Sequence, residues 1–202
     1  MKIMNKLAVA AVLLGVTLSI SAMADGLRLG IPSYGGTGCP GGSASVNLSP
    51  DESELTILFD SYVVEAGGTT GKRLDRKSCN ISIPVHVPNG YSIAIFQVDY
   101  RGFNSVPRGG LAQFDAEYFW AGSRGPRVSR PFYGPMRDNY TLTDTLAATT
   151  MVWSRCGDDV LLRANTSMRV QTNSMNQEAM STVDSADISS GLIYHFQMRR
   201  CH

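Results

Sequence analysis

The sequence predicts an all-β protein, folded as an antiparallel β-sandwich of roughly eight to ten strands with two disulfides. Three observations predict this fold. Hydrophobic and polar residues alternate in short runs, turn residues separate these runs, and four cysteines follow a leader for export. Alternation with a period of two is typical of strands that bury one face, and no longer window keeps a helical period.

The alternating runs mark where strands are expected. They cover residues 44–48, 55–59, 81–87, 91–100, 114–120, 140–143, 150–155, 160–164, 167–172 and 192–200. Pro84 has no backbone N–H to donate, so its strand is expected at a sheet edge or at a bulge. Ser49-Pro50-Asp51 and Asn89-Gly90 predict turns between neighbouring runs.

The first 24 residues have the features of a cleaved signal peptide. Lys2 and Lys6 precede an apolar run, Leu7–Ile20, and Ala22-Met23-Ala24 supplies a small-residue cleavage site. The run is too short to cross a ~30 Å hydrocarbon core comfortably, and no later stretch is longer. We therefore expect a secreted or periplasmic protein with no membrane span.

The mature chain is expected to hold one domain. Residues 25–42 are rich in glycine and proline and predict loop and turn, whereas residues 43–202 predict a single β-sandwich domain. The formal net charge of +1 becomes −1 when Lys2 and Lys6 leave with the signal peptide. Because nucleic-acid binding needs a basic surface, that near-neutral balance excludes nucleic acid as an expected partner.

Cys39, Cys79, Cys156 and Cys201 are even in number and show no Cys-x-x-Cys spacing, so two structural disulfides are expected outside the cytoplasm. Sequential pairing, Cys39–Cys79 with Cys156–Cys201, closes two moderate loops and is favoured. A Cys39–Cys201 bridge between the two ends remains open.

Several short strings resemble one family. They are Gly35-Gly36-Thr37-Gly38-Cys39-Pro40, Leu48-Ser49-Pro50-Asp51, Phe59-Asp60-Ser61-Tyr62, Arg76-Lys77-Ser78-Cys79, Val98-Asp99-Tyr100-Arg101-Gly102, Trp153-Ser154-Arg155-Cys156-Gly157 and Arg199-Arg200-Cys201. In order and in cysteine placement, these strings resemble the small secreted proteins of fungi and bacteria known as domain of unknown function 4360. The resemblance spans residues 35–201 and implies a secreted, cysteine-bridged protein. It implies no catalytic residues.

Signals for catalysis are weak. The histidines are His86, His195 and His202, no Gly-x-Ser-x-Gly string is present, and no ligand spacing indicates a metal, so no cofactor or metal is expected. His86 and His195 lie on polar sides of strands, where solvated rings are expected. Asp115 and Glu117, two apart on one strand, are the best candidates for a glycosidase carboxylate pair.

One pair of charges has a structural interpretation. Asp99 and Arg101 flank Tyr100 and are expected to share a strand face as a partly buried ion pair, with Tyr100 packed into the opposite side.

The segment Gly122–Tyr140 is the strongest candidate for binding. Arginine guanidinium groups and aromatic rings on a proline-stiffened loop suit sugars, carboxylates or phosphates of a polymer. The candidate residues are Trp120, Arg124, Arg127, Arg130, Phe132, Tyr133 and Arg137. An ordinary exposed crossover loop is the alternative interpretation.

The leading functional hypothesis is a non-catalytic, extracytoplasmic protein that binds a surface or polymer, of the cell-wall or extracellular polysaccharide class, through this segment. A secreted polysaccharide hydrolase using Asp115 and Glu117 is the first alternative. A structural protein of the envelope or extracellular layer, detectable by self-association, is the second.

Overall fold

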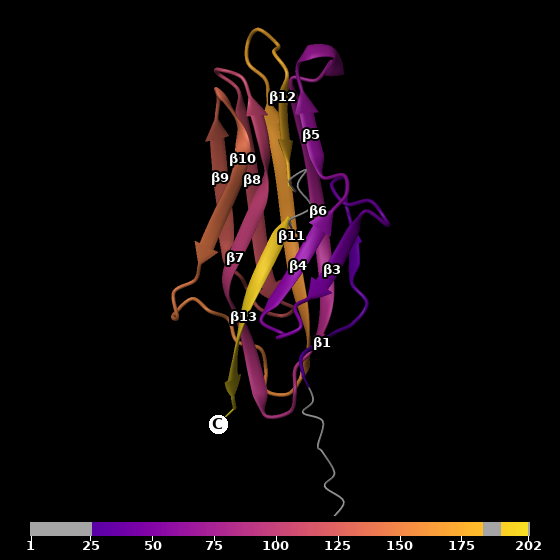
Figure 1. Cartoon of the computed structure of the whole chain (residues 1–202), viewed down its shortest axis with the longest axis vertical. Coiled ribbons are helices and arrows are strands. Elements are labelled where there is room, and N and C mark those ends of the chain that lie inside the picture. Colours follow the sequence, from indigo (N-terminus) through magenta and orange to yellow (C-terminus); the bar gives the residue numbers. More distant parts are fainter. Residues whose placement is uncertain (1–25, 184–190, 202) are drawn as a thin grey trace, which may run out of the picture.

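The computed structural model describes residues 26–183 and 191–201 and forms an elongated sandwich of two sheets (Figure 1). The expected signal peptide, residues 1–24, and His202 lie outside the described residues.

All strand pairing is antiparallel. The first sheet has the order β1 (Arg28–Leu29), β6 (Leu74–His86), β11 (Asp159–Gln171), β8 (Leu111–Trp120) and β9 (Arg127–Tyr133), and β2 (Ser33–Gly35) also pairs with β6. The second has the order β3 (Ala44–Leu48), β4 (Glu54–Phe59), β13 (Leu192–Arg200), β7 (Tyr91–Val106), β12 (Ala179–Thr182) and β5 (Val63–Ala66), and β10 (Met136–Thr145) pairs with β7. A short 3₁₀ turn, η1 (Gly68–Thr70), follows β5. The predicted all-β antiparallel sandwich is confirmed, with more strands than expected.

The additional strands lie where the sequence predicted loops. Residues 25–42 were expected to form loop and turn, but β1 and β2 in this segment add to the edge of β6. The expected crossover loop, Gly122–Tyr140, instead contains β9 and the first half of β10. Conversely, the strand expected at residues 150–155 is absent, and only Trp153 makes an isolated bridge, to Ala94.

Pro84 explains why the partner of β6 changes along its edge. Arg28 and Leu29 of β1 pair with His86 and Val85, and β2 pairs from Ser82 onward. Pro84 lies between these two partners, and its carbonyl accepts a hydrogen bond from the Gly30 amide at 2.8 Å. Since Pro84 cannot donate in return, the ladder with β1 and β2 is interrupted there. β6 lies between these two short strands and β11, so it is not the edge strand that was expected.

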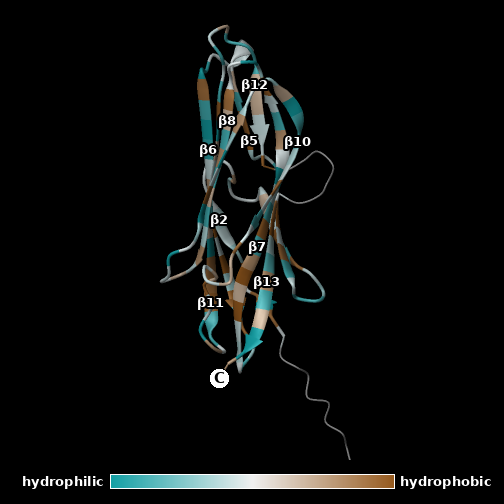
Figure 2. Cartoon of the chain, turned by 90° about the vertical axis from the view of Figure 1, so that its left-hand side faces the viewer, coloured by the Kyte–Doolittle hydropathy of each residue, from teal (hydrophilic) through white to brown (hydrophobic). Residues whose placement is uncertain are grey.

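Alternation on the long strands builds the core. Figure 2 shows the two layers from the side, with hydrophilic and hydrophobic residues following one another along the strands. The fully buried side chains include Leu55, Ile57, Ile81, Ile83, Phe114, Leu162, Met168 and Tyr194. They come from both sheets, so the inner faces share one core.

Both disulfides form with the favoured pairing. Cys39–Cys79 ties the N-terminal segment to β6, and Cys156–Cys201 ties the loop before β11 to the end of β13. The alternative Cys39–Cys201 bridge is therefore wrong. The bridges close loops with sequence separations of 40 and 45 residues, which the chain-entropy model values at roughly 4 kcal/mol each.

We predict unequal effects from removing the two disulfides. The variant Cys39→Ala/Cys79→Ala should lose about 2–5 kcal/mol of unfolding free energy, measured by urea titration. Cys156→Ala/Cys201→Ala should lose less unfolding free energy. The two loops are of similar length, but Cys39 and Cys79 are fully buried and Cys156 and Cys201 are not, so only the first variant also leaves a cavity in the core. Equal losses would show that loop closure alone determines the effect.

Candidate functional site

The predicted binding residues are spread over the sandwich instead of forming one surface. The hairpin β9–β10 crosses from the first sheet to the second, and strand alternation sends its side chains in different directions. Arg124 is exposed in the loop before β9, and Tyr133 is 73% exposed at the end of β9. Arg127 pairs with Glu117 on the neighbouring strand β8, at 3.1 Å.

Arg130 and Phe132 connect the two sheets. A guanidinium nitrogen of Arg130 lies 3.9 Å from Asp144 of β10. The rings of Phe132 and Tyr140 are 4.8 Å apart between their centroids. Because β9 belongs to one sheet and β10 to the other, both contacts close the side of the sandwich. These two residues therefore have structural partners.

Trp120 is a core residue. Its side chain is 5% exposed, its indole N–H donates to the Val152 carbonyl at 2.8 Å, and its ring stacks on Phe196. Trp120, expected among the exposed binding residues, is therefore buried in the core instead. Trp120 lies on the inward side of β8, together with the buried side chains of Phe114 and Tyr118.

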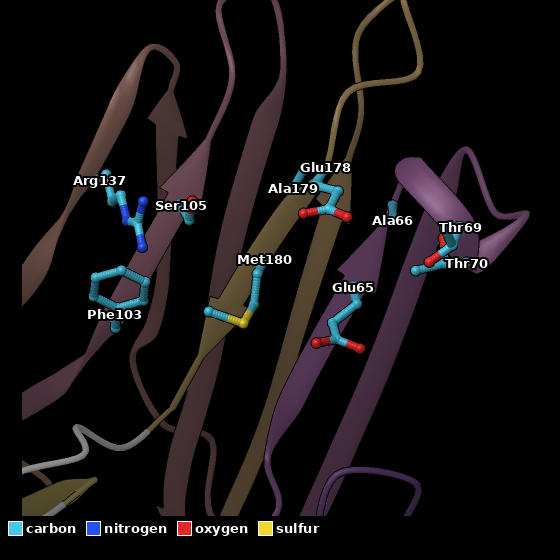
Figure 3. Close-up of a pocket in the computed structure, with 10 residues that line it drawn as sticks. All are labelled: Glu65, Ala66, Thr69, Thr70, Phe103, Ser105, Arg137, Glu178, Ala179 and Met180. Atoms are coloured by element: carbon cyan, nitrogen blue, oxygen red, sulfur yellow. The ribbon is translucent and has the colours of Figure 1, made fainter.

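Arg137, another of the predicted residues, borders a groove. The groove has a volume of about 350 Å³ and lies at the end of the second sheet (Figure 3). Its lining residues are Glu65, Ala66, Thr69, Thr70, Phe103, Ser105, Arg137, Glu178, Ala179 and Met180. That volume falls in the range of small-molecule sites.

Strand register brings these residues together. Glu65 of β5 faces Met180 of β12, Met180 faces Ser105 of β7, and Ser105 faces Arg137 of β10. One row therefore crosses four strands on a single sheet face. Phe103 lies two residues from Ser105 on β7 and so points to the same side.

The groove has apolar surface in the middle and charges on both sides. In Figure 3, Phe103 and Arg137 lie on one side, Met180 lies between, and Glu65 and Glu178 lie on the other. Within the described part of the chain, none of these three charged side chains makes an ion pair or a side-chain hydrogen bond. Their hydrogen-bonding capacity is therefore available to a ligand.

Two packed turns hold the acidic side of the groove. The Gly68 amide donates to the Asn176 carbonyl at 2.8 Å, and the Asn173 side chain donates to the Arg108 carbonyl at 2.9 Å. Gly67 has a φ of 80°, and a Cβ there would lie 2.1 Å from the Gln177 carbonyl oxygen. Glycine is therefore required where these turns meet.

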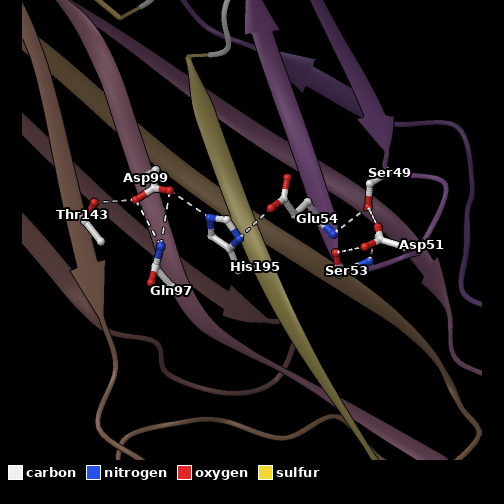
Figure 4. A network of polar contacts seen from close by, with 8 residues as sticks. All are labelled: Ser49, Asp51, Ser53, Glu54, Gln97, Asp99, Thr143 and His195. Atoms are coloured by element: carbon white, nitrogen blue, oxygen red, sulfur yellow. Dashed lines mark hydrogen bonds and ion pairs between the residues drawn. The ribbon is translucent and has the colours of Figure 1, made fainter.

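A polar network crosses the same sheet farther along β7 (Figure 4). His195 of β13 lies between two carboxylates: Nδ1 is 3.2 Å from Glu54 and Nε2 is 2.9 Å from Asp99. Asp99 also accepts a hydrogen bond from Thr143 at 2.6 Å. The network therefore connects β4, β13, β7 and β10.

The network corrects two expectations. His195 is not a solvated ring, since its side chain is 16% exposed and is held by both carboxylates. Asp99 does not pair with Arg101; its described partners are His195, Thr143 and Gln97. Burial tends to raise the pKa of Asp99, but hydrogen bonds from Thr143 and His195 and the charge of His195 hold it below the usual value.

The turn before β4 positions Glu54, the residue of β4 that contacts His195. Ser49 and Ser53 donate to the two oxygens of Asp51 at 2.6 and 2.8 Å, and these bonds, Ser49 first, lower the pKa of Asp51. The Ser49 hydroxyl in turn accepts the Glu54 amide at 2.9 Å. The predicted turn therefore determines where β4 begins.

Comparison with known proteins assigns the family. The family model described as "Domain of unknown function (DUF4360)" matches residues 25–201. The chain belongs to this family. An uncharacterized secreted protein of Arthroderma benhamiae is 33% identical over 170 residues, covering 84% of this chain and 69% of the relative. Together with its two disulfides, this relationship places the DUF4360 protein outside the cytoplasm.

A solved structure, TmCBM61 in complex with beta-1,4-galactotriose, matches with a TM-score of 0.33 and 11% identity. The match covers 84% of this chain and 88% of the other. A likeness this low carries no argument about ligand. Within residues 26–183 and 191–201, no helix is long and apolar enough to cross a membrane.

In this DUF4360 protein, the two candidate hydrolase carboxylates have structural partners. Asp115 accepts hydrogen bonds from Ser129 at 2.6 Å and from Gln113 at 2.9 Å, and Glu117 pairs with Arg127. The contacts with Ser129 and Arg127 join β8 to β9, and the Gln113 contact lies within β8. Among the described residues, no group of three or more histidine, cysteine or acidic side chains could hold a metal ion.

Sequence reasoning missed most of the groove. Glu65, Phe103, Ser105 and Glu178 were not candidates, and Met180 was assigned no binding role. The available signal was alternation: Phe103 and Ser105 lie on the polar side of β7. Their meeting with Glu65 depends on long-range pairing, which no local pattern encodes.

We predict that Thr143→Val lowers stability by about 1 kcal/mol at neutral pH, because it removes a hydrogen bond to an ionised carboxylate. Asp99 has a lowered pKa when folded, so its contribution is present above the unfolded value of 3.8 and is lost as pH falls through the folded pKa. The variant and wild type should therefore converge in acid. Urea titrations across pH, with Thr141→Val as the matched control on the same strand, test this; a pH-independent difference would contradict it.

Proposed function

We propose that this DUF4360 protein is a non-catalytic, extracytoplasmic protein that binds a polysaccharide of the cell-wall or extracellular class in the groove of Figure 3. The observation that supports this proposal is the arrangement of three unpaired charged side chains, Arg137, Glu65 and Glu178, around an apolar middle.

That arrangement matches the chemistry of a sugar ring. A pyranose presents apolar C–H surface on its faces and hydroxyl groups around its rim. Phe103 and Met180 supply apolar contact surface. Guanidinium and carboxylate groups supply charge-assisted hydrogen bonds to hydroxyls, donating from Arg137 and accepting at Glu65 and Glu178.

The scaffold favours binding without large rearrangement. Phe103, Ser105, Arg137 and Met180 lie on paired strands, where the backbone is fixed by ladder hydrogen bonds. Sites built on strands hold side chains more closely than sites on loops. A groove of this kind loses little conformational entropy when a ligand enters.

The test uses the full mature chain, folded oxidatively and incubated with insoluble peptidoglycan, chitin and cellulose. Depletion from the supernatant and release of soluble sugar are measured together. We expect depletion without release on at least one polymer. Sugar release would contradict a non-catalytic role. Self-association without depletion would favour the structural alternative and overturn the proposal.

Arg137→Ala and Phe103→Ala should each weaken this binding by about tenfold or more, the effect expected when a residue that contacts the ligand directly is truncated. Arg124→Ala is the matched control, because Arg124 is also an exposed arginine near the hairpin but lies outside the groove. Its affinity should stay within about twofold of wild type, well under 1.4 kcal/mol. If all three variants lost affinity equally, or if none lost affinity, the groove would not be the binding site. Thermal melts confirm that each variant is folded.

A further inference from the structure

The outer face of the first sheet carries a ladder of identical residue pairs. Across β6 and β11, Arg76 faces Arg169, Ser78 faces Ser167, and Asn80 faces Asn165. All six have the opposite alternation from the buried residues of these strands, such as Cys79 and Met168, and so point outward. The ladder is polar throughout and ends in two arginines.

The two arginines stand directly opposite one another without an acidic partner. Arg76 donates to the Ser167 hydroxyl at 3.3 Å, and Arg169 donates to the Gln113 side-chain oxygen. In the described ranges neither makes an ion pair with a carboxylate. Like charges directly opposite on a sheet are destabilising. The hydrogen bonds direct the two guanidinium groups to different neighbours, Ser167 of β11 and Gln113 of β8, but bring no negative charge to either.

The acids of the neighbouring strand are already engaged. Glu117 is paired with Arg127, and Asp115 accepts hydrogen bonds from Ser129 and Gln113. The Nε of Arg169 is buried without a hydrogen-bond partner. The protein itself therefore leaves the charge of the arginine pair incompletely satisfied.

A shallow hollow accompanies the ladder. It has a volume of about 330 Å³, and Arg76, Ser78, Asn80, Asn165 and Ser167 line it on one side. Arg169 borders this set but does not line the hollow, because its guanidinium group extends to Gln113 of β8. Asp115, Glu117 and Arg127 line the other side. The hydroxyl and amide groups next to Arg76 can donate to the remaining oxygens of a bound oxyanion.

The geometry points to an oxyanion-binding site at Arg76 in this hollow, next to the positive charge of Arg169, which takes the carboxylate or sulfate groups of an anionic polysaccharide. Guanidinium groups bind such oxyanions through paired N–H···O bonds. Binding also relieves the repulsion between the two arginines. The site lies on the opposite sheet from the groove of Figure 3 and does not depend on it.

The test measures retention of the mature protein on immobilised polygalacturonate (carboxylate), dextran sulfate (sulfate) and neutral dextran. The buffer contains about 0.1 M salt, so that charges more than ~10 Å apart are largely screened. We expect retention on one or both anionic resins and none on dextran. The resin that retains the protein identifies the oxyanion. Absence of retention on both anionic resins overturns the proposal.

Arg76→Gln should weaken retention by about tenfold, the loss of one charge-assisted contact. Arg169→Gln should weaken it less, because Arg169 lies beside the hollow and does not line it. Arg108→Gln, which removes an exposed arginine elsewhere, is the matched control and should change little. An equal loss in Arg108→Gln would indicate net charge alone and overturn the site.

Stability without ligand gives a second measure. Because the arginine pair is repulsive, Arg76→Gln should leave the melting temperature unchanged or raise it. A clear fall would assign Arg76 a structural role and overturn the proposal. Groove variants such as Arg137→Ala should keep retention on the anionic resins, so failure of this site and failure of the proposed function are distinguishable.

Discussion

The second sheet depends on one strand, β7, whose 16 residues pair along both edges. One edge is occupied by β10 throughout residues 97–106, while the other is shared by β13 and β12. At Gly102, where the partner changes, an added Cβ would lie 2.1 Å from the Thr182 carbonyl oxygen. Thr182 can approach the strand this closely because Gly102 has no side chain.

The same strand connects the polar network to the groove. Asp99, Phe103 and Ser105 share its outward face, so the alternation that buries Val98 and Tyr100 also aligns the polar contacts of His195 with the groove at Arg137. The Glu54–His195–Asp99 contacts hold β4 and β13 against this strand. The second sheet is thus held together by side-chain contacts as well as by the backbone ladder.

The sequence predicted what local patterns can encode. Alternation identified β8, but it predicted two strands, 160–164 and 167–172, where the structure has the single strand β11. The similar loop lengths led to the correct disulfide pairing. The sequence analysis missed β9 because the segment contains Pro131 and mostly polar residues. Only two of its seven residues, Val128 and Phe132, make inward hydrophobic contacts, which is too few to show alternation. Trp120 was misassigned against its own pattern, since the alternation that groups it with Tyr118 already places it inside.

Sites formed by long-range pairing were beyond such patterns. The groove joins residues from four strands, and the arginine ladder joins β6 to β11, more than 70 residues apart in sequence. What both sites share is charge that the fold leaves unpaired, at Arg137 and Glu65 in one and at Arg76 and Arg169 in the other. Unpaired charges stabilise nothing in the free protein, and like pairs destabilise it. In both proposed sites, the ligand would supply the opposite charge or the hydrogen bonds that the fold itself does not provide.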